Sequence, residues 1–132
     1  MLRRRRTTRP PTSRKEAPKI ILCGHADELS LPAIQLNSER PYLTLVLKGD
    51  FNEWDDANNI IVQIGAQQFL PRYVGALGAN VTEFLSAKTG ATEKGRLQIN
   101  VKVEGELAGG EHEVLVRFFD SAVSDTCSIK LI

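Results

Sequence analysis

The chain has 132 residues, a length that suits one domain, and 42% of them are hydrophobic, which is normal for a globular protein and excludes a disordered one. The longest unbroken apolar run, residues 20–23, is too short to span a bilayer, and no apolar stretch of signal-peptide length follows the basic N-terminus. Two cysteines are too few for a disulfide framework or a four-cysteine zinc site.

The net charge of +1 hides an uneven distribution. Residues 1–19 contain eight basic residues and one acidic residue, a net charge of +7, whereas residues 20–132 contain nine basic and fifteen acidic residues, a net charge of −6. Residues 1–19, called the arm from here on, have too few apolar side chains to form a core, and their three prolines oppose a helix. We therefore expect an extended arm that becomes ordered against a partner of opposite charge. Its candidate partner-binding residues are Arg3, Arg4, Arg5, Arg6, Arg9, Arg14 and Lys15.

The first expected strands follow the arm directly. An N-terminal strand is expected over residues 19–23, and residues 31–36 are a candidate for a second, short one. Three leucines at every second position of residues 43–48 alternate with other side chains, which is typical of a strand with one face toward a core.

Residues 50–56 form the densest acidic cluster, with Asp50, Glu53, Asp55 and Asp56 on one expected loop. Oxygen ligands on a loop suit calcium, but the spacing is not that of an EF-hand and the glycine needed for its bend is absent. A solvated acidic loop is the simpler interpretation. These four carboxylates are also the candidate acceptor site for a basic arm.

The middle of the chain contains one more clear strand, residues 60–64, with β-branched side chains at every second position. Within residues 67–94 the only helical candidate is 81–88, with Asn80 as candidate N-cap and Gly90 as candidate C-terminal stop. A loop that crosses between two sheets is the alternative for this candidate. The sequence leaves the structure of the whole 67–94 segment open.

The last part of the chain alternates most clearly, over residues 97–104, 111–119 and 127–131. The strands 101–106 and 111–119, joined through Gly109 and Gly110, are predicted to form a hairpin. The side chains predicted to point inward are Leu97, Ile99, Val101, Val103, Val114, Val116, Phe118, Cys127, Ile129 and Leu131.

Val46, Leu115 and Phe119 alternate out of phase with the inward rows; if they face outward together, they form an exposed apolar row that would suit a partner interface. The alternative is that this face packs beneath the segment 67–94.

Six or seven short strands, recurrent turns and no strand–helix alternation predict an all-β fold. We expect an antiparallel sandwich in which two inner faces pack together. The expected organisation is the arm over residues 1–19 and one sandwich domain over residues 20–132. At about 110 residues, the domain is large enough to fold alone.

The order of these elements is similar to that of a known family. The corresponding segments are a strand that ends in a Gly-x-Phe turn (45–51), two further strands (59–65 and 96–103), a Gly-x-x-x-Val closing strand (110–116) and a terminal strand (128–132). Over residues 17–132 the chain resembles the IPT/TIG group of immunoglobulin-like domains. The resemblance implies an immunoglobulin-like antiparallel β-sandwich that acts as a binding or structural module, without catalytic residues.

Few side chains are candidates for chemistry. His25 and His112 are the only histidines, and no second Cys/His pair completes a tetrahedral site, so no metal is expected. Cys23 and Cys127 lie on the first and last expected strands, where either a disulfide or two buried thiols can form; the missing secretion signal favours thiols. No phosphate-binding loop, nucleophile elbow or triad spacing occurs, so we expect neither an enzyme nor a cofactor.

Three hypotheses of function remain. The leading one is a virion structural protein, specifically a capsid decoration or cement protein of a bacteriophage, made in the host cytoplasm and anchored through its arm to neighbouring subunits of a homo- or hetero-oligomeric assembly. One alternative is a nucleic-acid-binding coat-type protein whose arginines contact phosphates. The other is a carbohydrate- or cell-surface-binding module that uses the loops around Trp54 or Tyr73. None of the three involves a membrane.

Overall fold

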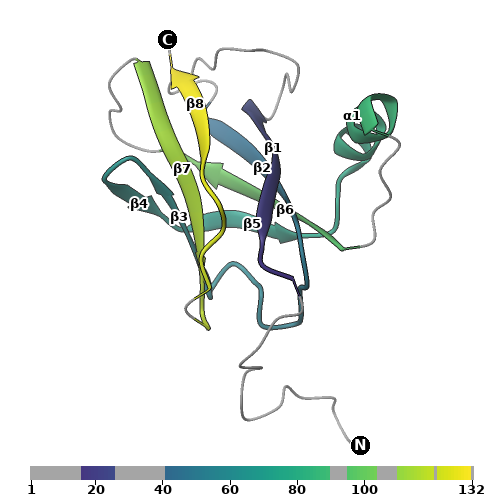
Figure 1. Cartoon of the computed structure of the whole chain (residues 1–132), viewed down its shortest axis with the longest axis horizontal. Coiled ribbons are helices and arrows are strands. Elements are labelled where there is room, and N and C mark those ends of the chain that lie inside the picture. The colour runs from purple at the N-terminus through teal and green to yellow at the C-terminus, as the bar shows by residue number, and fades with distance from the viewer. Residues whose placement is uncertain (1–15, 26–40, 90–94, 104–109, 121, 132) are drawn as a thin grey trace, which may run out of the picture.

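The structure is a computed structural model that describes residues 16–25, 41–89, 95–103, 110–120 and 122–131 (Figure 1). In chain order its elements are β1 (Lys19–His25), β2 (Tyr42–Lys48), β3 (Ile60–Ile64), β4 (Gln67–Phe69), β5 (Pro71–Gly75), α1 (Ala79–Thr89), β6 (Arg96–Lys102), β7 (Gly110–Phe118) and β8 (Cys127–Leu131). Within these described ranges, no helix is long and apolar enough to cross a membrane.

The strands form two four-stranded antiparallel sheets, one in the order β1-β2-β6-β5 and the other in the order β4-β3-β7-β8. The sheets face each other across one hydrophobic core (Figure 1). The predicted all-β antiparallel sandwich is therefore confirmed. β1 and β8 are edge strands of different sheets, and they contact each other along one side of the sandwich.

The core is built from the side chains that alternate along the strands, because every second residue of a strand points to the same face. Every side chain of the predicted inward rows belongs to the main core cluster or packs directly against it. Each fully buried aliphatic side chain contributes about 1.5–3 kcal/mol relative to exposure. The buried residues of this cluster are Leu43, Leu45, Leu47, Ile60, Val62, Ile64, Leu97, Ile99, Val101, Val103, Val114, Val116, Phe118, Ile129 and Leu131.

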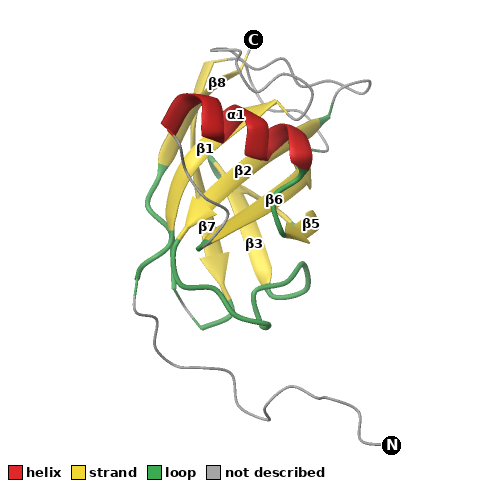
Figure 2. Cartoon of the chain, turned by 90° about the vertical axis from the view of Figure 1, so that its right-hand side faces the viewer, coloured by secondary structure: helices red, strands yellow, loops and turns green. Residues whose placement is uncertain are grey.

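The helix α1 adds a third layer. It lies across the outer face of the β1-β2-β6-β5 sheet (Figure 2). Val81 and Leu85 of the helix pack against Val46 of β2, with Leu22 and Leu77 beside them. β2 is thus buried on both faces, which explains why a valine occupies an outward position of this strand and is fully buried there.

Of the two alternatives for residues 81–88, the helix is correct and the crossing loop is not, but the helix begins earlier than the candidate did. α1 starts at Ala79, so Asn80 lies inside its first turn instead of at the N-cap. The carbonyl of Gly78 accepts a hydrogen bond from the N–H of Thr82 at 2.9 Å, and the N–H of Gly78 donates to Oε1 of Gln98 at 2.7 Å. A side chain of β6 therefore satisfies the backbone at the helix start, a contact that a local capping pattern cannot reveal.

One predicted strand pairing is wrong. The hairpin predicted for residues 101–106 and 111–119 does not form, because β6 pairs with β2 and β5 in one sheet whereas β7 pairs with β3 and β8 in the other. Alternation along a strand tells which side chains face the core, but it does not tell which strand is the neighbour. The segment 67–94 contains β4, β5 and α1. The candidate strand 31–36 and the candidate stop Gly90 lie outside the described residues.

Of the two alternatives for Val46, Leu115 and Phe119, the exposed apolar row is wrong. Val46 lies beneath α1 on the outer face of one sheet, whereas Leu115 lies on the outer face of the other sheet. Phe119 follows the end of β7 and packs against Trp54. For Val46 the alternative is correct, since its face is covered by the segment 67–94.

Candidate functional site

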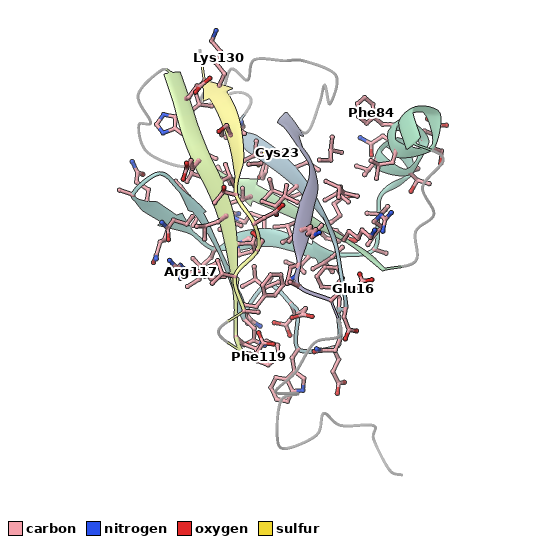
Figure 3. The ribbon with its side chains drawn as sticks, in the orientation of Figure 1. Glu16, Cys23, Phe84, Arg117, Phe119 and Lys130 are labelled. Carbon is pink, nitrogen blue, oxygen red and sulfur yellow. The ribbon has the colours of Figure 1, made fainter. Side chains whose placement is uncertain are left out.

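The end of the sandwich where the arm meets the domain also carries the acidic loop. This arm-proximal end consists of residues 16–18, the loop 49–59 and the loop between β7 and β8, and it lies at the bottom of Figure 1. Glu16 and Phe119 mark it in Figure 3. The arm residues Arg3, Arg4, Arg5, Arg6, Arg9, Arg14 and Lys15 lie outside the described residues.

The base of the arm is fastened to the domain. Pro18 is buried, and the N–H of Ile20 donates to Oδ1 of Asp125 at 2.7 Å. The N–H of Asp125 in turn donates to the carbonyl of Pro18 at 3.4 Å. The arm therefore joins the domain at a fixed place. Sequence analysis did not single out Asp125, because its partner lies 105 positions away and no local pattern signals the contact.

The acidic loop is held by its own hydrogen bonds. Oδ2 of Asp55 accepts the N–H of Asn52 at 2.9 Å, and Oδ1 of Asn52 accepts the N–H of Trp54 at 2.8 Å. Oδ1 of Asp56 accepts the N–H of Asn58 at 3.0 Å. Side chains of this kind stabilise turns by satisfying nearby backbone N–H groups. The loop is therefore a defined turn structure and not a loose acidic segment.

The four candidate acceptor carboxylates consequently differ in what they can do. Asp55 is only 6% exposed, and its carboxylate serves the loop itself. Asp56 is half-buried and supports the next turn. Glu53 is exposed, and Asp50 is half-buried on the wall of a hollow. Of the four, Glu53 is the most exposed carboxylate, and Asp50 is the one that lines the hollow beside the arm.

Two aromatic contacts anchor the acidic loop. The ring of Phe51 stacks on Phe118, with centroids 6.2 Å apart and an interplanar angle of 26°. The rings of Trp54 and Phe119 lie 5.9 Å apart at a tilt of 40°. Pairs of this geometry contribute about 0.5–1.5 kcal/mol beyond burial of their area. They bind the loop to the end of β7, so the carboxylates of the loop have fixed positions relative to the sandwich.

A hollow of about 460 Å³ lies beside the acidic loop, where the arm meets the domain. A second hollow of about 310 Å³ adjoins it and shares Glu16 and Lys48 with it. The N–H of Gly49 donates to the carbonyl of Gly95 at 3.0 Å, and this hydrogen bond joins two backbone segments that line the larger hollow. The charged side chains that line the two hollows carry both signs: Glu16 and Asp50 against Lys19, Lys48 and Arg96.

Within the part of the chain that the structure describes, no group of three His, Cys, Asp or Glu side chains could hold a metal ion. His112 lies on β7 and is half-buried; its Nδ1 is 3.4 Å from the position that a Cβ on Gly65 would occupy. The side chain of His25 lies outside the described residues.

The two cysteines do come together. Cys23 on β1 and Cys127 on β8 are free, half-buried thiols, and their side chains form a hydrogen bond. This hydrogen bond, together with burial, raises the pKa of Cys23 well above its ordinary value. The same hydrogen bond lowers the pKa of Cys127, against opposing effects of burial and of Asp125.

No family model matches the chain, and no curated protein and no solved structure matches it.

Proposed function

We propose that this chain is a non-enzymatic structural protein of a virion, a capsid decoration or cement protein of a bacteriophage. The sandwich is its rigid body, and the arm attaches it to acidic surface on a neighbouring copy. The observation that carries the proposal is the position of the arm. It joins the domain at a fixed place, beside the acidic loop, and its charge of +7 is complementary to the −6 of the remaining residues.

The length of the arm supports attachment to a neighbour. Residues 1–15 span at most about 50 Å when fully extended. A domain of about 110 residues has a radius of gyration of about 13 Å, so the arm can reach well past its own domain. Prolines and repelling arginines favour such an extended chain. Arginines that reach an acidic surface form bidentate pairs with carboxylates.

The shared location of arm and acceptor also suggests the symmetry of the contact. When two copies meet at their arm-proximal ends, each arm reaches the acidic loop of the other. Such a reciprocal contact is closed and two-fold symmetric, so it produces a discrete dimer. The acceptors in this arrangement are Glu53 and Asp50.

We further propose that the sandwich is immunoglobulin-like. The strand order β1-β2-β6-β5 corresponds to the order A-B-E-D of that fold, and β4-β3-β7-β8 corresponds to C′-C-F-G. This correspondence supports the resemblance to the IPT/TIG group. Because such a fold hosts many unrelated functions, it adds nothing to the choice of partner.

A second candidate function is nucleic-acid binding by the same arm. Four consecutive arginines, Arg3 to Arg6, favour phosphate contacts with little sequence preference. Under this hypothesis the chain is a coat-type protein: the sandwich is its structural domain, and the arm contacts the packaged genome instead of another protein.

Size-exclusion chromatography with light scattering separates the two candidates. The intact protein, purified without nuclease, is compared with a chain that starts at Ala17, and the 260/280 nm absorbance ratio is recorded for both. Arm-to-protein attachment predicts a dimer with a protein-only ratio, which dissociates as NaCl is raised, and a monomer for the shortened chain. A raised ratio that nuclease abolishes would support nucleic-acid binding. Identical masses and protein-only ratios for both chains would refute both candidates.

A pair of double variants then tests the acceptor. Asp50→Asn with Glu53→Gln removes two carboxylates from the arm-proximal end, and it should shift the protein toward monomer as the shortened chain does. Glu111→Gln with Glu113→Gln is the matched control, because it removes two exposed carboxylates from the outer face of β7. Equal effects of the two double variants would mean that the acidic loop is not the acceptor.

A further inference from the structure

The two cysteines occupy a place in the fold where a covalent bond would have a definite effect. β1 is the edge strand of one sheet and β8 is the edge strand of the other, and the two strands contact each other. Cys23 lies opposite Leu45 in the β1–β2 pairing, and Cys127 lies opposite Val114 in the β7–β8 pairing. Both thiols pack against the main core cluster (Cys23 is labelled in Figure 3).

We propose that Cys23 and Cys127 form a reversible disulfide that joins the first and last strands and closes this side of the sandwich. Nothing in the proposed function requires this bond, so the inference stands apart from it. The two side chains already contact each other where β1 of one sheet meets β8 of the other. Among the described strands, β1 and β8 each have a hydrogen-bonded neighbour on one side only, which leaves room for the shift that brings two sulfur atoms to the bonded distance of about 2.05 Å.

The oxidant is a small-molecule disulfide such as oxidised glutathione. The thiolate of Cys127 attacks one sulfur of that disulfide, which forms a mixed disulfide and releases one glutathione thiolate. The thiol of Cys23 then loses its proton and attacks Sγ of Cys127, which releases the second glutathione. The protein thiols are oxidised by two electrons, the disulfide reagent is reduced to two thiols, and the two protons end on the released glutathione.

The order of the two steps follows from the hydrogen bond between the thiols. This bond raises the pKa of Cys23 and lowers that of Cys127, so the thiolate forms more readily on Cys127. Cys127 is therefore the attacking residue and Cys23 the resolving residue. The bond closes a loop that contains most of the domain, and a loop of this length strongly restricts the unfolded chain. It also ties β1, from which the arm extends, to the other sheet.

The test uses the full-length reduced protein incubated with mixtures of oxidised and reduced glutathione. We expect the number of free thiols, titrated after denaturation, to fall from two to none, with an intact mass lower by two hydrogens. Non-reducing peptide mapping should find the peptides of Cys23 and Cys127 joined, and the urea midpoint of the oxidised protein should rise. Excess dithiothreitol should restore both thiols and the original midpoint.

Two variants check the assigned roles. Cys23→Ser should stop at the mixed disulfide, which adds one glutathione to the mass. Cys127→Ser should react more slowly than Cys23→Ser, because burial still raises the pKa of its remaining thiol, Cys23. Peptide mapping of the wild-type chain needs neither variant to fold. Retention of both thiols in oxidised glutathione, stable protein-bound glutathione on the wild type, or cross-links between two chains would each overturn the proposal.

Discussion

Replacing Asp55 with alanine should destabilise the whole domain, although Asp55 lies on a loop. Its Oδ2 accepts the N–H of Asn52 at 2.9 Å, and the residue is only 6% exposed. Alanine removes this acceptor and leaves the backbone donor in place. A hydrogen bond to a charged acceptor contributes about 1.5–3 kcal/mol, so we expect the free energy of unfolding to fall by about 2 kcal/mol.

Urea unfolding followed by fluorescence measures this loss directly. Trp54 is the only tryptophan of the chain, and it lies next to Asp55 on the loop, so its emission reports the loop and the domain together. For a domain of this size the urea m-value is about 2 kcal/mol per molar. A loss of about 2 kcal/mol therefore moves the midpoint down by about 1 M, with an unchanged slope if the loop unfolds together with the sandwich.

Glu53→Ala is the matched control at NaCl high enough to dissociate the proposed arm contact, because Glu53 is an exposed carboxylate of the same loop. Its midpoint should stay close to that of the wild type, since surface substitutions change stability by at most about 0.5 kcal/mol. Asp55→Asn keeps an oxygen acceptor without the charge, so its midpoint should fall between those of the wild type and Asp55→Ala. A wild-type midpoint for Asp55→Ala, or equal losses for Asp55→Ala and Glu53→Ala, would refute this account of the loop.

Other predictions concern the helix, a tight turn and the arm. Leu85→Ala should lower the free energy of unfolding by about 2–3 kcal/mol in a urea titration, because the side chain of Leu85 is 4% exposed and packs between α1 and the sheet. Glu83→Ala, which changes an exposed residue of the same helix, should have little effect. Gly49→Ala should lower the melting temperature in calorimetry, because a Cβ there would lie 3.3 Å from Cζ of Phe51; an unchanged melting temperature would mean that the neighbours yield at no cost. At NaCl high enough to dissociate the proposed arm contact, removal of residues 1–15 should leave the urea midpoint unchanged, since the described contacts at the base of the arm, buried Pro18 and the Ile20–Asp125 hydrogen bond, are kept.

The sequence by itself determined which side chains face the core. Alternation with a period of two is a local property of the backbone, so the inward rows of β2, β3, β6, β7 and β8 could be predicted residue by residue and are buried as expected. The all-β class follows from the same rows. The residues of the helix mark it as a helical candidate. They do not distinguish the helix from a crossing loop or show where it begins, because Gln98 on another strand accepts the hydrogen bond of the Gly78 N–H at its start.

Only the tertiary structure decided what lies beside each strand. An apolar outward residue such as Val46 has the same local pattern whether it is exposed or covered, and the covering helix lies more than thirty positions along the chain. The predicted hairpin failed for the same reason, since alternation does not distinguish a neighbour in the same sheet from one in the facing sheet. The acidic loop shows the same limit within a few residues: four carboxylates look alike in the sequence, but the turn buries Asp55 and leaves Glu53 exposed. Contacts between distant residues, such as Asp125 with Ile20 and Cys23 with Cys127, exist only after the two sheets have packed together.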